Sequence, residues 1–139
     1  MASTPAFSWR ILGLVVLGGM LGVAARAALV WPFDAAAVPL ATAAINIVGA
    51  CALGIVVGAL GTRHPSARAF LGTGILGGFT TYSAFAVQVA TLAPVAPWLA
   101  LLIAAVSLIA GVAGAGLGLW VGRRLGHRPG APDAPAEAE

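Results

Sequence analysis

The chain has 139 residues, of which 60% are hydrophobic and 8% charged, and its mean hydropathy is +1.02. Soluble domains carry about a quarter of their residues as charged side chains, so this composition excludes a soluble fold and predicts an all-α integral membrane protein. The net charge of +3 reflects seven arginines, which in a membrane protein indicate topology. No basic patch with interleaved aromatic residues accompanies them, so no nucleic-acid partner is expected.

Four apolar runs are long enough to cross the hydrocarbon core of a bilayer, which takes about 20 residues. They are residues 11–30, 39–60, 67–90 and 97–121. Tryptophans flank the first and fourth runs, as expected for rings at headgroup depth. We therefore expect an N-terminal tail at residues 1–8, a four-helix transmembrane domain at residues 9–125 and a disordered C-terminal tail at residues 126–139.

The arginines predict the orientation of the bundle. Six of the seven fall on one side: Arg10, Arg63, Arg68, Arg123, Arg124 and Arg128. The other side has only Arg26, near the end of the first run, and the acidic Asp34. Because flanking arginines are enriched on the cytoplasmic side, we expect a multi-pass membrane protein with both termini in the cytoplasm. Arg26 either draws anions toward a pore mouth or extends to the interface near Trp31.

The second run holds two polar residues, Thr42 and Asn46. Polar groups at membrane depth cost free energy unless they find partners, which makes them candidates for function. The amide of Asn46 can donate a hydrogen bond to an anion, or it can join two helices. The sequence leaves both interpretations open.

The third run contains GTGILGGFTTYSAF, residues 72–85, in which four glycines precede the hydroxyl residues. Glycines weaken a helix, so we expect this helix to be broken near the membrane midplane, with free backbone oxygens that line a cavity or bind an ion. Alternatively, the hydroxyls that follow satisfy the carbonyls of a simple kink. Tyr82 and Phe85 lie beside the break, and their ring edges carry partial positive charge that can face an anion.

The fourth run has a single polar residue in its middle, Ser107, and such a serine often bonds a carbonyl of its own helix. No run has Asp, Glu, Lys or His in its middle. A proton-coupled exporter needs a membrane-embedded carboxylate and an enzyme needs clustered catalytic side chains, so both classes are disfavoured. Each run also has two glycines four residues apart, which let helices approach closely. Because four such helices make a thin bundle, we expect a pore between two copies.

Three stretches resemble, in order and spacing, the Fluc (CrcB-type) fluoride channels. They are GGMLGVAAR (18–26), PLATAAINIVG (39–49) and GGFTTYSAF (77–85). The resemblance covers all four runs and implies a fluoride-selective channel in the bacterial inner membrane, which exports fluoride and so reduces its toxicity. It also implies an antiparallel dimer with two fluoride pathways and a structural sodium ion at the broken third helices.

The resemblance also implies roles for single residues. The backbone carbonyls of Gly77 and Thr80 would hold the sodium ion, a hard cation that suits oxygen ligands. Five residues would form the fluoride pathway as donors, ring edges or a polar track: Asn46, Tyr82, Ser83, Phe85 and Ser107. Arg26 would lie toward a vestibule.

The chain departs from the family pattern at four positions. The family usually has Phe at the position of Tyr82, Thr at Ala84, Gly at Ala41 and often Glu at Gln88. These differences alter the aromatic residues and the polar track of the implied pathway.

The arginine bias is also strong, whereas a homodimer with both orientations needs a weak bias. We therefore hypothesise that the second subunit is a paired homologue of reversed topology, with an identical chain as the alternative. Two other functions stay open: a small four-helix exporter and a non-conducting membrane assembly subunit.

Overall fold

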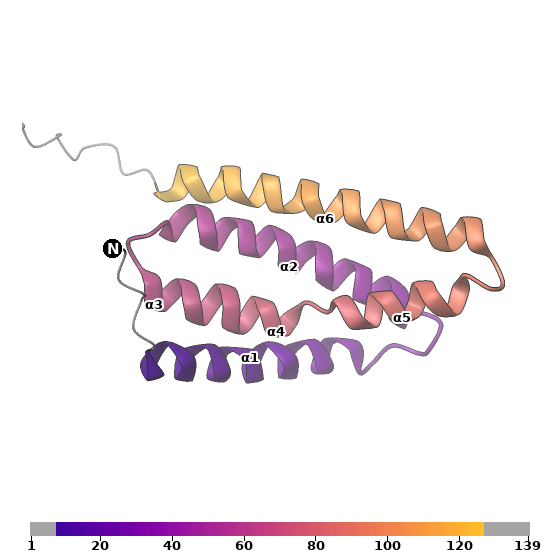
Figure 1. Ribbon diagram of the computed structural model, residues 1–139, viewed down its shortest axis with the longest axis horizontal. Helices are drawn as coiled ribbons and strands as arrows, with labels where there is room; N and C mark the ends of the chain where they lie inside the picture. Colours follow the sequence, from indigo (N-terminus) through magenta and orange to yellow (C-terminus); the bar gives the residue numbers. More distant parts are fainter. Residues whose placement is uncertain (1–7, 127–139) are drawn as a thin grey trace, which may run out of the picture.

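The computed structural model describes residues 8–126, which fold into helices joined by short connections (Figure 1). The elements are α1 (Trp9–Val30), α2 (Val38–Leu60), α3 (Pro65–Arg68), the π-helix η1 (Ala69–Leu76), α4 (Gly77–Phe79), α5 (Tyr82–Leu92) and α6 (Pro97–Gly126). No strand occurs between residues 8 and 126, and four helical spans are long and apolar enough to cross a membrane, which confirms the predicted all-α membrane fold. The two predicted tails lie outside the described residues, apart from Ser8 and Gly126.

Short-range contacts fix where the first two helices begin and end. The Ser8 hydroxyl caps α1 by accepting a hydrogen bond from the Ile11 N–H at 3.4 Å. In the turn before α2, the Asp34 carboxylate accepts one from the Ala37 N–H at 2.9 Å. α2 ends at Leu60, and the capping residue that follows is Gly61, whose φ of 52° lies in the left-handed region that glycine adopts without strain.

A glycine seam joins α1 to η1 and α4, which lie beside it in Figure 1. A Cβ atom added at Gly18 would lie 2.9 Å from the Cα of Gly74, and one added at Gly22 would lie 2.8 Å from the backbone nitrogen of Phe79. Any side chain there would collide with backbone, so glycine is required for this approach. Close backbone contact supplies the dispersion attraction that associates helices in lipid.

A second glycine seam joins α2 to α6 along most of their length (Figure 1). A Cβ atom at Gly54 would lie 2.7 Å from the backbone nitrogen of Leu119, and one at Gly58 would lie 2.8 Å from that of Arg123. The glycine pairs that the sequence predicts to allow close approach therefore lie at these helix contacts. The chain is built from two tightly packed helix pairs.

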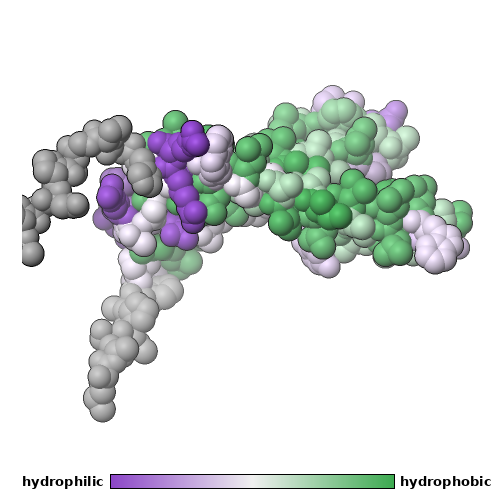
Figure 2. Space-filling model, turned by 90° about the horizontal axis from the view of Figure 1, so that it is seen from above, coloured by the Kyte–Doolittle hydropathy of each residue, from purple (hydrophilic) through white to green (hydrophobic). Residues whose placement is uncertain are grey.

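The outside of the bundle is apolar rather than polar. The buried hydrophobic residues among those described are Ile45 and Ala100, while many large Leu, Val, Ile and Trp side chains are exposed. Figure 2 shows these hydrophobic side chains covering most of the length of the molecule, with hydrophilic ones gathered mainly at one end. Because lipid tails are as apolar as leucine, such a surface costs little free energy in a bilayer.

The third span, Pro65–Leu92, is not a uniform α-helix. After the short α3 it continues as the wider π-helical turns of η1, a conformation that often marks functional sites. After α4, Thr80 has φ −80° and ψ 156° and Thr81 has φ −146° and ψ 112°, both extended conformations, before α5 begins at Tyr82. This interruption positions the candidate site.

Candidate functional site

A side chain of α2 holds the interruption at Thr81. The Asn46 Nδ2 donates to the Thr81 carbonyl at 3.0 Å, and the Thr81 N–H donates to the Asn46 Oδ1 at 2.8 Å. The side-chain amide thus replaces helical hydrogen bonds that the extended backbone of Thr81 cannot make. An asparagine NH₂ carries two hydrogens, so the second remains for another acceptor. Of the two roles predicted for Asn46, the structure displays the joining of helices directly.

Hydroxyl groups satisfy part of the interrupted backbone. The Thr80 Oγ1 donates to the Leu76 carbonyl at 2.9 Å, which also accepts the Thr80 N–H at 3.0 Å. The Thr81 Oγ1 caps α5 by accepting from the Ala84 N–H at 3.3 Å, and it lies 3.1 Å from the Ser83 hydroxyl. These bonds correspond to the kink interpretation of the sequence. They do not engage the Thr80 carbonyl, which its ψ of 156° turns away from the helical direction.

Aromatic rings stand beside the interruption. The centroids of Tyr82 and Phe85 lie 6.1 Å apart, and the rings are inclined by 49°. Phe85 lines a cavity of about 310 Å³ together with Asn46, Gly77 and Thr80. Tyr82 lines the same cavity but is 81% exposed in the single chain. Asn46, Gly77, Thr80, Tyr82 and Phe85 therefore line one cavity, whereas Ser83 and Ser107 do not line it.

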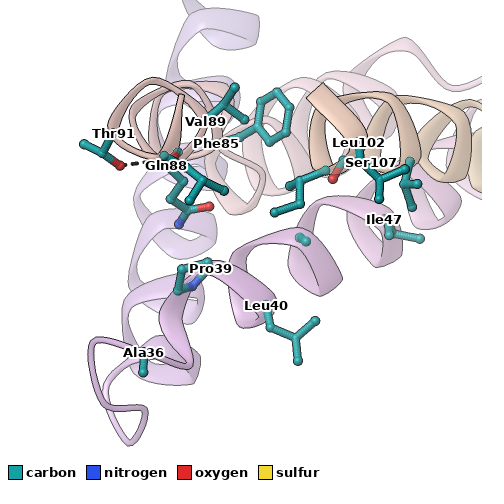
Figure 3. Close-up of a pocket in the computed structure, with 14 residues that line it drawn as sticks. Ala36, Pro39, Leu40, Ile47, Phe85, Gln88, Val89, Thr91, Leu102 and Ser107 are labelled. Carbon is teal, nitrogen blue, oxygen red and sulfur yellow. Dashed lines mark hydrogen bonds between the residues drawn. The ribbon is translucent and has the colours of Figure 1, made fainter. Parts of the chain in front are cut away.

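A larger cavity of about 750 Å³ lies between α2, α5 and α6 and shares Phe85 with the first (Figure 3). Ser107 of α6 lines it, as does Gln88 of α5, whose side chain points into the space toward the start of α2. The Gln88 Nε2 donates to the Thr42 Oγ1 at 3.2 Å, and the Thr42 side chain is only 4% exposed. The two cavities are therefore neighbours with the Phe85 ring as a common wall.

Neither Gln88 nor Thr42 is among the fluoride-pathway residues predicted from the sequence. One signal pointed to Thr42, because it lies four residues before Asn46 and so shares its face of α2. Arg26 lines neither cavity, and its Nε is a buried atom that has no hydrogen-bond partner among the described residues. Its predicted place at a vestibule stays a prediction.

Comparison with known proteins identifies the family. The family described as "CrcB-like protein, Camphor Resistance (CrcB)" matches residues 13–119 of this chain. The chain belongs to the CrcB-like family. The "Fluoride-specific ion channel FluC 2" of Bacillus subtilis is 42% identical to it over 118 residues, which cover 84% of this chain and 90% of the relative. The "Fluoride-specific ion channel FluC" of Hyphomonas neptunium is 39% identical over 127 residues, covering 81% and 94% respectively. The resemblance inferred from the three sequence stretches is confirmed.

In this CrcB-like chain, the site offers neutral donors and ring edges instead of charged side chains. The acidic residue of the described part, Asp34, lies in the connection between α1 and α2. No group of three or more His, Cys, Asp or Glu side chains that could hold a metal comes together within residues 8–126. Such a site suits an anion that accepts hydrogen bonds, or a cation held by backbone oxygens alone.

Proposed function

We propose that the chain is a subunit of a fluoride-selective ion channel that exports fluoride from the cytoplasm and so reduces its toxicity. Relatives that are named fluoride-specific ion channels support the proposal. The structural observation that carries it is the bonding of Asn46 to Thr81, which keeps the third span unwound beside two cavities that share Phe85. Fluoride is small, strongly hydrated and a strong acceptor, so it leaves water only for close donors in a narrow path.

The proposed pathway runs through both cavities. The second N–H of Asn46 and the ring edges of Tyr82 and Phe85 face fluoride at the smaller cavity. The Ser83 hydroxyl, 3.1 Å from the Thr81 Oγ1, adds a donor beside the interruption. Ser107 continues the polar track in the larger cavity. Chloride is larger and less strongly hydrogen-bonded, so it gains less from the same donors. Arg26 raises the local anion concentration at the vestibule.

A structural sodium ion is part of the proposal. The last carbonyls of α4 have no N–H donor from a following helical turn, because α4 ends at Phe79 and the chain continues as extended backbone. Gly77 and Thr80 line the smaller cavity, where their backbone oxygens form the negative end of a helix. Unwound carbonyls of this kind suit Na⁺ in membrane proteins, so the donor set fits the ion. Bound between two subunits, sodium would supply a fixed positive charge that both sets of carbonyls share.

The proposed assembly is an antiparallel dimer in the bacterial inner membrane, with both termini in the cytoplasm. The 81% exposure of Tyr82 at a candidate ion site supports a second subunit that covers it. Five described arginines lie at one end of the bundle and only Arg26 lies toward the other, which supports a single orientation for this chain. The partner is then a paired homologue of reversed topology, or an identical chain if insertion is mixed.

Growth of a bacterium that lacks its own fluoride exporter tests this function. Expression of the chain with a reversed-topology homologue is expected to restore growth on fluoride, whereas chloride tolerance stays unchanged. A small exporter coupled to protons would make the rescue depend on the proton gradient. A non-conducting assembly subunit would give no rescue with any partner, and this result would contradict the proposal.

A further inference from the structure

One end of the bundle carries a cluster of exposed arginines. The start of α1, the connection from α2 to α3, and the end of α6 meet at this end (Figure 1). They contribute five exposed side chains: Arg10, Arg63, Arg68, Arg123 and Arg124. Figure 2 shows the hydrophilic side chains of the molecule concentrated at one end, beyond a long hydrophobic body.

Four of these arginines surround the last turn of α2. An added Cβ atom at Gly58 would lie 2.8 Å from the backbone nitrogen of Arg123, so the end of α6 packs directly on that turn. From the other direction, the Arg68 Nη1 donates to the Gly61 carbonyl at 3.4 Å, just past the end of α2. Arg63 belongs to the same connection, and Arg124 follows Arg123 on α6. We name Arg63, Arg68, Arg123 and Arg124 the arginine cluster.

Arg63, Arg68 and Arg124 lie at the end of α2 opposite to the carboxylate of Asp34. Asp34 is the acidic residue within residues 8–126, and it precedes α2, whereas the cluster surrounds the opposite end of that helix. The Arg124 guanidinium lies 4.2 Å from the ring centroid of Trp120. Tryptophan rings prefer the level of the lipid headgroups, so this stacking holds one member of the cluster at headgroup depth.

We propose that the arginine cluster binds the phosphate headgroups of anionic phospholipids in the leaflet that it faces. Guanidinium groups bind phosphate oxygens bidentately, and basic surfaces between transmembrane helices recognise anionic headgroups. The acyl chains of such a lipid lie along the apolar outer surfaces of α2 and α6, directly below the cluster. This inference goes beyond the proposed function, because it does not depend on which ion crosses the membrane.

The test uses the purified full chain in detergent, titrated with dioleoylphosphatidylglycerol or dioleoylphosphatidylcholine and followed by native mass spectrometry. We expect several-fold stronger retention of phosphatidylglycerol, and a loss of about fivefold for each arginine neutralised. The double variants Arg63→Gln/Arg68→Gln and Arg123→Gln/Arg124→Gln therefore lose the preference. The matching Arg→Lys variants keep most of it, and Thr62→Gln in the same connection leaves it unchanged.

Two results would overturn the inference. One is equal retention of the two lipids by the wild-type chain, a comparison that requires no variant to fold. The other is an unchanged preference for phosphatidylglycerol in both Arg→Gln double variants, because this outcome would place the lipid away from the arginine cluster. A fluoride flux measured in the same variants reports on the channel separately, so failure of lipid binding and failure of the proposed function are distinguishable.

Discussion

Asn46 and Thr81 pair through two hydrogen bonds, one from the side-chain amide to the backbone carbonyl at 3.0 Å and one from the backbone N–H to the side-chain oxygen at 2.8 Å. The two residues come from different membrane spans, and Thr81 is 9% exposed. A buried backbone needs a partner for each polar group. The Asn46 side chain supplies both partners, so it removes the free-energy cost that the extended backbone of Thr81 would otherwise carry at membrane depth.

Replacement of this side chain gives the first prediction. Asn46→Ala leaves both backbone groups of Thr81 unpaired, and we expect it to lower the free energy of unfolding by about 2–4 kcal/mol and to abolish fluoride flux. Asn46→Asp keeps an oxygen for the Thr81 N–H, but its ionised form has no donor for the Thr81 carbonyl and places a charge at membrane depth, so flux is again lost. Unfolding in mixed micelles and fluoride efflux from liposomes measure the two effects. Wild-type stability and flux in Asn46→Ala would show that the pairing has no role.

The bond between Gln88 and Thr42 gives a second prediction. Thr42→Val and Gln88→Leu each leave one polar group without its partner, whereas the double variant leaves none. A double-mutant cycle should therefore yield a coupling free energy of about 0.5–1.5 kcal/mol in unfolding. Additive effects of the two substitutions would mean that the 3.2 Å contact contributes nothing.

The ring edges give a third prediction. Tyr82→Phe retains the ring and is expected to keep fluoride flux within about twofold of wild type, since only the hydroxyl is removed. Phe85→Leu removes the wall shared by the two cavities and should reduce flux about tenfold, the effect of losing about 1.4 kcal/mol of interaction with the ion. Initial rates of efflux, normalised to protein content, provide the measurement. Equal fluxes for Phe85→Leu and wild type would remove Phe85 from the pathway.

The glycine seam between α2 and α6 gives a fourth prediction. A Cβ atom at Gly118 would lie 3.1 Å from the Cα of Cys51 and would collide with the Cys51 carbonyl oxygen, whereas one at Gly111 meets nothing within 4 Å. We expect Gly118→Ala to destabilise the fold by about 1–3 kcal/mol, because the helices must separate. Gly111→Ala on the same helix is the control, with unchanged or higher stability. Equal behaviour of the two variants would argue against the seam.

The long elements could be predicted from the sequence because hydrophobic length alone defines a membrane span. The first run, residues 11–30, differs from α1 by two residues at its start. The π-helical turns of η1 were not predicted, since an i to i+5 hydrogen-bond pattern leaves no signature in side-chain periodicity.

The candidate site was only partly predictable. Its polar members stand out in an apolar chain, so Asn46, Ser83 and Ser107 could be selected from sequence. The partners of Asn46 and Gln88 could not, because pairing between residues 35 or 46 positions apart depends on how the helices dock. Gln88 in particular has no neighbour in sequence that indicates its bond to Thr42.

The most direct test of the account is fluoride efflux from liposomes that contain the purified chain, alone and together with a homologue of reversed arginine bias, recorded with a fluoride electrode. The account predicts rapid fluoride release with the pair, no matching chloride release, and loss of the fluoride signal in Asn46→Ala. Absence of fluoride release in every combination, with correctly folded protein in the membrane, would contradict it.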